Sequence, residues 1–199
     1  IGHYEASAGS HRLNHLLTKK LLESPENYEI VEFSFEGEKE LQKAVQVEIW
    51  LTVFLFLNVY SPFSLGVYVD GRLVDSFLED GKASDVLAIM MGAALKKYSP
   101  DEIYYTNGPG NSMSLKIAYI TLKTVAVIRQ IPLYGVSPFL FNGEKPIRGI
   151  GGGFFVKDKN GIMLQKSKDL KEKVLSLPDY SDFTSSKTDA EPFYMIDAV

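Results

Sequence analysis

The sequence predicts an α/β protein, in which helices pack against a mixed sheet and a small α+β segment comes first. Three observations support this class. Between residues 51 and 137, short apolar runs typical of strands alternate with two helical segments. An Asp70-Gly71 pair separates two such runs, which is a strong signal for a two-residue hairpin turn. Hydrophobic residues make up 45% of the 199 residues, enough for a packed core.

Residues 1–50 form the first of three zones and are rich in charged side chains. A helix is predicted from Ser10, its expected N-cap, to Ser24, where Pro25 ends it. Its apolar stripe consists of Leu13, Leu16, Leu17 and Leu21. A strand over 28–35 and a short helix over 36–46 complete the zone.

The second zone, residues 51–140, contains the predicted sheet. Strands are expected over 51–58, over 64–79 with the turn at Asp70-Gly71, over 101–106 and over 131–137. The first helix, over 83–99, is predicted to have Ser84 as its cap, with Lys96 and Lys97 in the last turn, where they suit the helix dipole.

The third zone, residues 141–199, has a weaker pattern. A hairpin is predicted over 153–165 with its turn at Asn160-Gly161. Residues 180–191 have the polarity of a loop, and residues 192–199 form a short extended tail.

Composition excludes several classes of protein. A net charge of −4 provides no electrostatic surface for direct nucleic-acid binding, and the absence of cysteine excludes disulfides and thiolate metal sites. The apolar stretch Val53–Val69 is interrupted by Asn58, Pro62 and Ser64, so no membrane span is predicted. We expect an intracellular, cytoplasmic protein. Because the chain begins at Ile1 and its first methionine is Met90, we expect its natural start to lie upstream.

A glycine-proline loop precedes the second predicted helix. It consists of Gly108, Pro109, Gly110, Asn111 and Ser112. A dinucleotide fingerprint needs a third glycine at GxGxxG spacing, which is missing, and Pro109 removes an amide donor. A P-loop needs Gly-Lys followed by Ser or Thr, which is also missing. The prediction is a strand-to-helix turn capped by Ser112 or Ser114, with nucleotide binding as the alternative.

The two helices of the second zone are unusually apolar. No side chain from Val86 to Leu95 is charged, and between residues 115 and 128 only Lys116 and Lys123 are. A helix that only covers a sheet needs one apolar stripe and a polar outer face. We therefore expect a second polypeptide to cover these helices, the alternative being cover by the N-terminal zone. The predicted partner-binding residues are Val86, Leu87, Met90, Met91, Ala94, Leu115, Ala118, Leu122 and Val125. Much of the other side of the second helix consists of Ile117, Ile120, Thr121, Thr124 and Ile128.

From about residue 51 onward the chain resembles the TsaB family of the tRNA threonylcarbamoyladenosine pathway. The family patterns "LAIDTS", "GPGSFTGLRIGxATAKGLA", "IPLxGVSSL" and "PxYLR" correspond to "LFLNVYS", "GPGNSMSLKIAYITLKTVA", "IPLYGVSPF" and "EPFYMIDAV". The matching positions are Gly108, Pro109, Gly110, Leu115, Ile117, Lys123, Ile131, Pro132, Gly135, Val136, Ser137, Pro192 and Tyr194.

This resemblance implies an actin/Hsp70-like (ASKHA) lobe with a shortened second lobe and no cofactor of its own. It implies an accessory subunit that docks the enzyme TsaD through helices, with ATP and metal on TsaD. A TsaE-like ATPase and, through the complex, tRNA are further implied partners, and a homodimer is an open alternative. The sequence departs from the family pattern at Asn58, where the family has Asp, and at Ala83-Ser84, where it has His-Ser.

The first zone resembles the C-terminal end of LpxC, the zinc deacetylase of lipid A synthesis, on "GHYEASAGSHRLNHLLTKKLLESPENYEIVEF". The resemblance assigns His11 to a catalytic histidine that assists at the attacked amide. The family's zinc-binding segment precedes this region, and His3, His11 and His15 provide no fitting ligand set. We therefore expect an inactive remnant with no metal site. Our interpretation is a reading frame truncated at its start and joined to its neighbour, the alternative being a genuine fusion.

Three functions are thus compared: a TsaB-like scaffold, an LpxC-type deacetylase and a peptidase, the last a label that TsaB relatives carry. All three histidines lie near the N-terminus, so a Ser/His/Asp arrangement would have to cross the junction near residue 50. The scaffold is the predicted function, and the deacetylase is the alternative.

Overall fold

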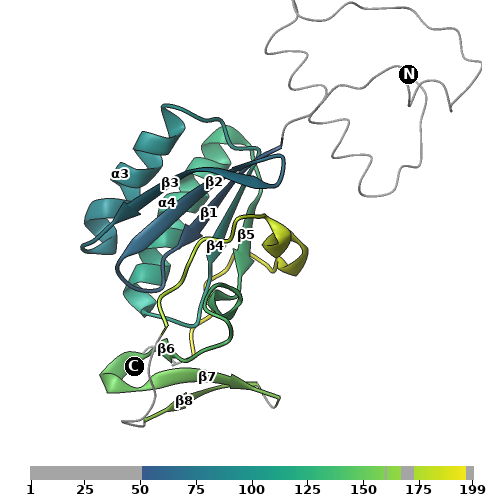
Figure 1. Ribbon diagram of the computed structural model, residues 1–199. Coiled ribbons are helices and arrows are strands. Elements are labelled where there is room, and N and C mark those ends of the chain that lie inside the picture. Colours follow the sequence, from purple (N-terminus) through teal and green to yellow (C-terminus); the bar gives the residue numbers. More distant parts are fainter. Residues whose placement is uncertain (1–50, 160, 167–172, 196–199) are drawn as a thin grey trace, which may run out of the picture. The chain divides into compact units, whose positions relative to one another are not determined.

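The computed structural model describes residues 51–159, 161–166 and 173–195 (Figure 1). The predictions for residues 1–50, including the helix after Ser10 and the role of His11, lie outside the described residues, as does Asn160 of the second hairpin. The described residues belong to the compact unit that begins at Leu51.

A five-stranded mixed sheet forms the centre of this unit. Its strands are β1 (Thr52–Leu57), β2 (Phe63–Val69), β3 (Arg72–Glu79), β4 (Glu102–Thr106) and β5 (Leu133–Val136), in the spatial order β3-β2-β1-β4-β5. Strand β2 is antiparallel to both β1 and β3, whereas β1, β4 and β5 are parallel to one another. The predicted fold class, a mixed sheet with packed helices, is confirmed.

The predicted hairpin turn between β2 and β3 is also confirmed. Asp70 and Gly71 both have positive φ, 49° and 77°, which is the backbone that the Asp-Gly pair favours in a two-residue turn. The adjoining strand pair contains a bulge between Val67 and Tyr68.

Helices α3 (Ala83–Leu95) and α4 (Ser112–Arg129) cover one face of the sheet (Figure 1). The predicted N-cap of α3, Ser84, and the placement of Lys96 and Lys97 in its last turn are wrong. Its N-cap is Lys82, which provides no side-chain hydrogen bond, and the Ser84 hydroxyl donates to Asp85 within the first turn. Lys96 is the C-cap, so Lys96 and Lys97 lie just beyond the last helical turn.

The cap of α4 is Asn111, not Ser112 or Ser114. The Asn111 side-chain oxygen accepts a hydrogen bond of 3.0 Å from the Ser114 backbone N–H. Asparagine is among the strongest N-caps because its short amide reaches the free N–H groups of the first turn. At the other end, Gln130 has a left-handed backbone, and its N–H reaches the carbonyls of Ala126 and Val127.

The opposite face of the sheet is covered by residues that follow β5. A second, three-stranded antiparallel sheet has the order β6-β7-β8, with β6 at Ile147–Arg148, β7 at Phe154–Asp158 and β8 at Gly161–Gln165. Short 3₁₀ helices occur at η2 (Pro138–Phe141), η3 (Ile150–Gly152) and η4 (Asp182–Ser186). The predicted strand pair of the third zone is thus present as β7 and β8.

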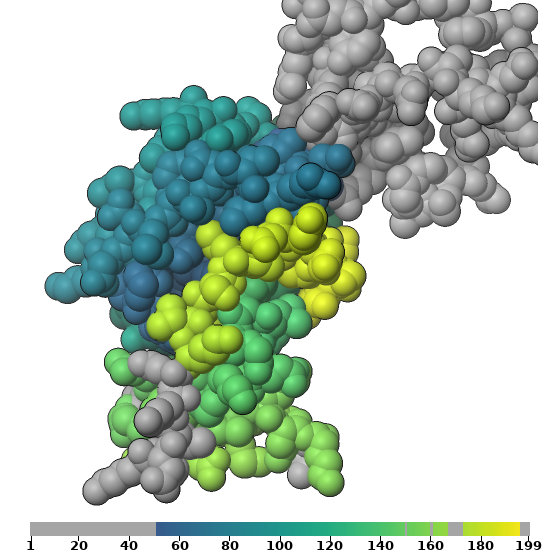
Figure 2. Space-filling model, in the orientation of Figure 1, coloured from purple at the N-terminus to yellow at the C-terminus, as the bar shows by residue number. Residues whose placement is uncertain are grey.

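Residues 173–195, called here the C-terminal belt, cross this face from one edge of the sheet to the other. Tyr180 forms a β-bridge with Arg72 of β3, and Thr188 forms one with Gly135 of β5. Figure 2 shows the belt, in yellow-green to yellow, lying against the blue surface formed by residues of the β1–β3 region.

The belt contributes one large aromatic side chain to the core of this face. Phe183 of η4 is 6% exposed, and its ring makes edge-on contacts with Tyr68, Tyr104 and Phe141 at centroid distances of 5.2, 5.5 and 5.9 Å. Residues on both sides of position 140 therefore share one core.

Candidate functional site

The nine predicted partner-binding residues form the inner sides of α3 and α4. Seven of them are at most 2% exposed, because they pack between the helices and the sheet. These are Leu87, Met90, Met91, Ala94, Leu115, Ala118 and Leu122. Val86 and Val125 are half-buried against the same core. The chain's own residues already cover most of the surface of these nine side chains, and their contact with a partner stays a prediction.

The outer side of α4, by contrast, remains apolar and exposed. Ile120, Val127 and Ile128 are 55%, 64% and 75% exposed, and Ile89 of α3 is exposed as well. The sequence indicated this side through Ile120, Thr124 and Ile128, but it did not show which side of the helix faced outward. The "outer α4 face" is defined here as Met113, Lys116, Ile120, Lys123, Thr124, Val127 and Ile128, all of them exposed.

A shallow groove of about 360 Å³ lies on this outer α4 face. The Thr124 hydroxyl donates to the Ile120 carbonyl at 2.8 Å, so it is satisfied within the helix. The groove is therefore an apolar surface with one cationic group, and such exposed surfaces usually mark an interface. It is lined by Tyr119, Ile120, Lys123, Thr124, Val127 and Ile128.

The glycine-proline loop before α4 is filled by the chain's own residues. A Cβ on Gly108 would meet the backbone carbonyl of Phe193, and φ at Gly108 is +121°, which disfavours any other residue. A Cβ on Gly110 would lie 2.6 Å from Cβ of Val59. The Asn111 N–H donates to the Val59 carbonyl at 3.1 Å. These contacts support the prediction of a strand-to-helix turn that positions α4.

Asn107 joins this loop to the C-terminal belt. Its side-chain amide lies 3.2 Å from the Thr188 hydroxyl and from the backbone carbonyls of Asp189 and Glu191. Its backbone carbonyl accepts from the Phe193 N–H at 2.7 Å. Gly135 allows this approach, because a Cβ there would collide with the Asn107 amide. Sequence reasoning missed Asn107, since a polar residue before a loop carries no distinctive pattern.

Two buried tyrosines also hold the belt. The Tyr68 hydroxyl donates to the Pro178 carbonyl at 2.8 Å, and the Tyr105 hydroxyl donates to the Ala190 carbonyl. Burial, reinforced by nearby acidic groups, raises the pKa of both phenols well above the usual range. Both side chains consequently remain protonated donors at any physiological pH.

Asn58 stands where the TsaB resemblance has an aspartate, at the end of β1. It is fully buried, and its backbone N–H donates to the Thr106 hydroxyl at 2.9 Å while its side-chain oxygen accepts from that hydroxyl at 3.2 Å. The site is thus a neutral hydrogen-bonded pair that joins β1 to β4.

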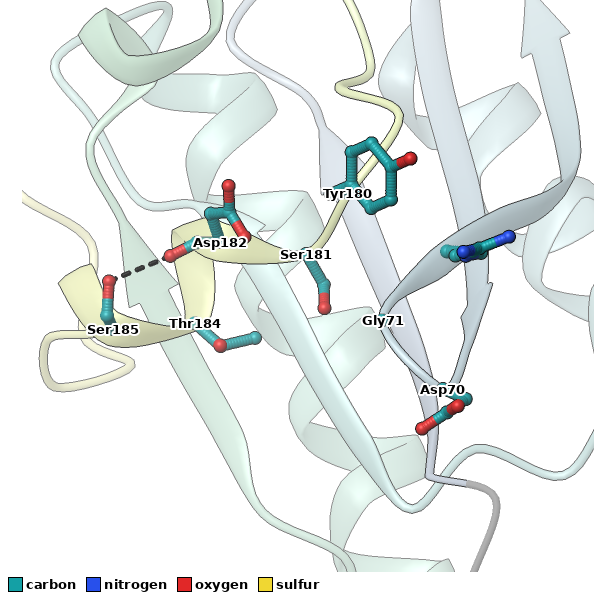
Figure 3. A pocket seen from close by; sticks show the side chains of 8 residues that line it. Asp70, Gly71, Tyr180, Ser181, Asp182, Thr184 and Ser185 are labelled. Carbon is teal, nitrogen blue, oxygen red and sulfur yellow. Dashed lines mark hydrogen bonds between the residues drawn. The ribbon is translucent and has the colours of Figure 1, made fainter.

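A polar pocket of about 710 Å³ lies where the belt crosses the β2–β3 turn (Figure 3). Asp70 and Asp182 lie at opposite ends of it. The Ser181 N–H donates to the Gly71 carbonyl at 2.9 Å, so the pocket wall is part of the belt's attachment. Across the described residues, no three His, Cys, Asp or Glu side chains lie close enough together to hold a metal ion. The lining residues are Asp70, Gly71, Arg72, Tyr180, Ser181, Asp182, Thr184 and Ser185.

The first zone of the chain matches curated deacetylases. Over 44 residues it is 59% identical to the UDP-3-O-acyl-N-acetylglucosamine deacetylase of Sulfurimonas denitrificans, and over 34 residues it is 71% identical to that of Nitratiruptor. These matches cover 22% and 17% of this chain, and the chain spans only 15% and 11% of those enzymes' length. The resemblance of the first zone to the C-terminal region of LpxC is confirmed.

The structure is similar to YeaZ from Pseudomonas aeruginosa, which is a TsaB protein. The TM-score is 0.45 at 18% identity, with 59% of this chain and 65% of that chain covered. A second structure, described as an uncharacterized protein with similarity to peptidase YEAZ from Pseudomonas aeruginosa, gives the same values over 64% of its length. At this identity and TM-score the likeness carries no information on activity, partners or sites.

No protein-family profile matches the chain. Within the part of the chain that the structure describes, no helix combines the length and the hydrophobicity needed to cross a bilayer.

Proposed function

We propose that the part of the chain from Leu51 onward is a TsaB-like scaffold, which binds and activates a TsaD-like enzyme in tRNA threonylcarbamoyladenosine modification. In this proposal the TsaD-like subunit holds the ATP and the metal, a TsaE-like ATPase joins the complex, and tRNA is contacted through the assembly. The protein acts in the cytoplasm. The proposal is supported by the sequence motifs at residues 108–126, 131–139 and 191–199.

The observation that carries the proposal is the exposed outer α4 face. Burying three side chains as large as Ile120, Val127 and Ile128 would contribute several kcal/mol to association, at about 1.5–3 kcal/mol for each fully buried side chain. The N-terminus of the helix is positioned by the Asn111 cap and by the loop contacts with Val59 and Phe193. A fixed helix with an apolar outer side suits docking against a partner's helices.

The test is complex formation between the full chain and the TsaD-like protein encoded in the same genome. Size-exclusion chromatography with light scattering should show a heteromer with the wild-type chain and none with the Ile120→Glu, Val127→Glu double variant. The matched control is Val74→Glu with Leu78→Glu, which changes two exposed apolar residues of β3 (52% and 67% exposed). Equal loss of binding in both double variants, or no binding by the wild-type chain, would contradict the proposal.

A deacetylase of the LpxC type is the second candidate, and the identity of the first zone to these enzymes favours it. Because the chain spans 15% of their length, we propose that it does not deacetylate the acylated UDP-sugar by itself. The measurement is zinc content together with deacetylation by the purified chain. Stoichiometric zinc with turnover that is lost in His11→Ala would establish this second function instead.

A further inference from the structure

The outer α4 face carries charge of only one sign. Helix α4 contains Lys116, Lys123 and Arg129, all exposed, and no Asp or Glu between Ser112 and Arg129. The whole chain, in contrast, has a net charge of −4. Two of these cations, Lys116 and Lys123, belong to the outer α4 face, whereas Arg129 is the last residue of the helix and lies outside that face.

The cations also lie along the apolar stripe itself. Lys116, Ile120, Lys123 and Val127 follow one another at spacings of four, three and four residues, which places them along one side of the helix. Lys123 lines the groove directly. Any helix that covers Ile120 and Val127 must consequently pass close to Lys123, and to Lys116 one or two turns away.

A second copy of this chain fits this surface poorly. The groove spans residues 119–128, so a two-fold axis through its centre pairs each Lys123 with the same residue of the other copy. Like charges that meet across an interface are repulsive, and α4 supplies no carboxylate to compensate.

We infer that the outer α4 face accepts an acidic amphipathic helix of a different protein and disfavours a second copy of this chain. The occupant has apolar side chains at i, i+3 or i+4 and i+7, flanked by Asp or Glu that face Lys116 and Lys123. This inference rests on the proposed function only in using the same surface, because it specifies the chemistry of the partner and not its identity.

The test uses two synthetic helical peptides with the same leucine stripe, one flanked by Glu and the other by Lys. Fluorescence anisotropy with the full chain at low salt should show about tenfold tighter binding of the Glu-flanked peptide, as expected for a few exposed charge pairs. The preference should shrink at high salt, because exposed charges are screened. Lys123→Glu should reduce or reverse the preference, whereas Lys145→Glu, at an exposed position outside α4, should leave it unchanged.

Equal binding of the two peptides, or binding of neither at about 1 mM, would overturn the inference. A wild-type homodimer that Ile120→Glu dissociates would also overturn it, because the second copy would then be the occupant. These outcomes are distinct from failure of the proposed function. If the chain prefers the Glu-flanked peptide but does not bind the TsaD-like protein, the inference is supported and the proposed partner is wrong.

Discussion

The two faces of the five-stranded sheet are covered in different ways. On one face, α3 and α4 bury mainly aliphatic side chains, and few polar contacts join the helices to the strands. On the other face, the C-terminal belt is irregular, and it is held by the Asn107 amide, the hydroxyls of Tyr68 and Tyr105, and the Phe183 ring. Helices satisfy their own backbone groups, whereas an irregular segment needs partners for its backbone.

This difference explains where the exposed apolar surface lies. A helix can carry apolar residues on both sides without losing a backbone hydrogen bond, so the outer side of α4 is free to serve a partner. The belt is less suited to bind a partner, because its backbone carbonyls at Asp179, Thr188 and Glu191 already accept hydrogen bonds from the rest of the fold. We therefore expect a partner to dock on the helical face, whereas the belt serves to cover the other face of the sheet.

The largest expected effect separates the inner from the outer side of α4. Leu122→Asp places a carboxylate in the core. We expect it to lower the free energy of unfolding by at least as much as a leucine truncation, which costs about 2–5 kcal/mol. Ile120→Asp, at a position that is 55% exposed, should change the free energy of unfolding by no more than about 0.5 kcal/mol. Urea unfolding followed by circular dichroism measures both. Equal destabilisation would show that the two sides were assigned incorrectly.

On the belt face, Phe183→Ala removes the ring that three other aromatic side chains surround. We expect a loss of about 3–5 kcal/mol in the free energy of unfolding, typical of a buried phenylalanine truncation. Tyr180→Ala is the control, because this ring is 56% exposed on the same belt. If the two variants unfold at the same urea concentration, the belt is not packed as described.

Asn107→Ala should loosen the belt without removing the core. The variant loses the amide's partly buried hydrogen bonds to the belt, which costs about 0.5–1.5 kcal/mol. Hydrogen exchange should accelerate at the Thr188 and Phe193 amides, which bond to Gly135 and Asn107. Asn111→Ala is the matched control: it should cost about 1 kcal/mol as a lost helix cap while leaving exchange in the belt unchanged.

Two glycine substitutions should change the stability of the fold in opposite directions. Gly108→Ala adds a Cβ that meets the Phe193 carbonyl at a positive φ, and we expect it to destabilise by about 1–3 kcal/mol. Gly92→Ala lies in the interior of α3, where a Cβ meets nothing within 4 Å, and should stabilise by about 0.5–1 kcal/mol. Thermal unfolding of both variants provides the measurement. A stabilising Gly108→Ala would mean that Phe193 of the C-terminal belt does not lie against the glycine-proline loop.

The smallest effect concerns a polar contact on the helical face. Although desolvation acts in the opposite direction, hydrogen bonds from the Ser76 N–H, the Tyr98 hydroxyl and Lys97 lower the pKa of Asp75 below its ordinary value of 3.8. A lowered folded pKa stabilises the fold above that ordinary value, and this contribution is lost as pH falls through the folded pKa. The Tm difference between wild type and Asp75→Asn should therefore be larger at pH 7 than at pH 2.5. A difference that does not change with pH would contradict the role of Asp75.

The strands and the first hairpin could be predicted from the sequence because their signals are local. Short apolar runs bounded by turn residues and the Asp70-Gly71 pair indicate backbone geometry without help from distant residues. The cap of α4 was assigned to the wrong residue because Asn111, Ser112 and Ser114 all have capping side chains, and only the exit path of the loop decides among them.

The orientation of the helices and the belt could not be predicted in the same way. A helix that is apolar on both sides, such as α4, does not reveal which side meets the sheet. Phe183 lies within the polar stretch "YSDFTSSKTDAE", so its burial depends on Tyr68 and Tyr104 far away in the sequence. The Asn107 contacts mostly involve backbone carbonyls, which leave no residue pattern in the belt.

The way in which Asn107 holds the belt has a consequence for evolution. Two of the three acceptors of its amide, at Asp189 and Glu191, are main-chain oxygens, and Phe193 donates its main-chain N–H in return. Because these hydrogen bonds use main-chain atoms of the belt, they tolerate almost any side chain at the belt positions. Asn107 and the neighbouring Gly135, in contrast, admit little variation. Among descendants of this chain, the side chains of Asp189 and Glu191 should therefore vary freely, whereas Asn107 and Gly135 should change rarely and together.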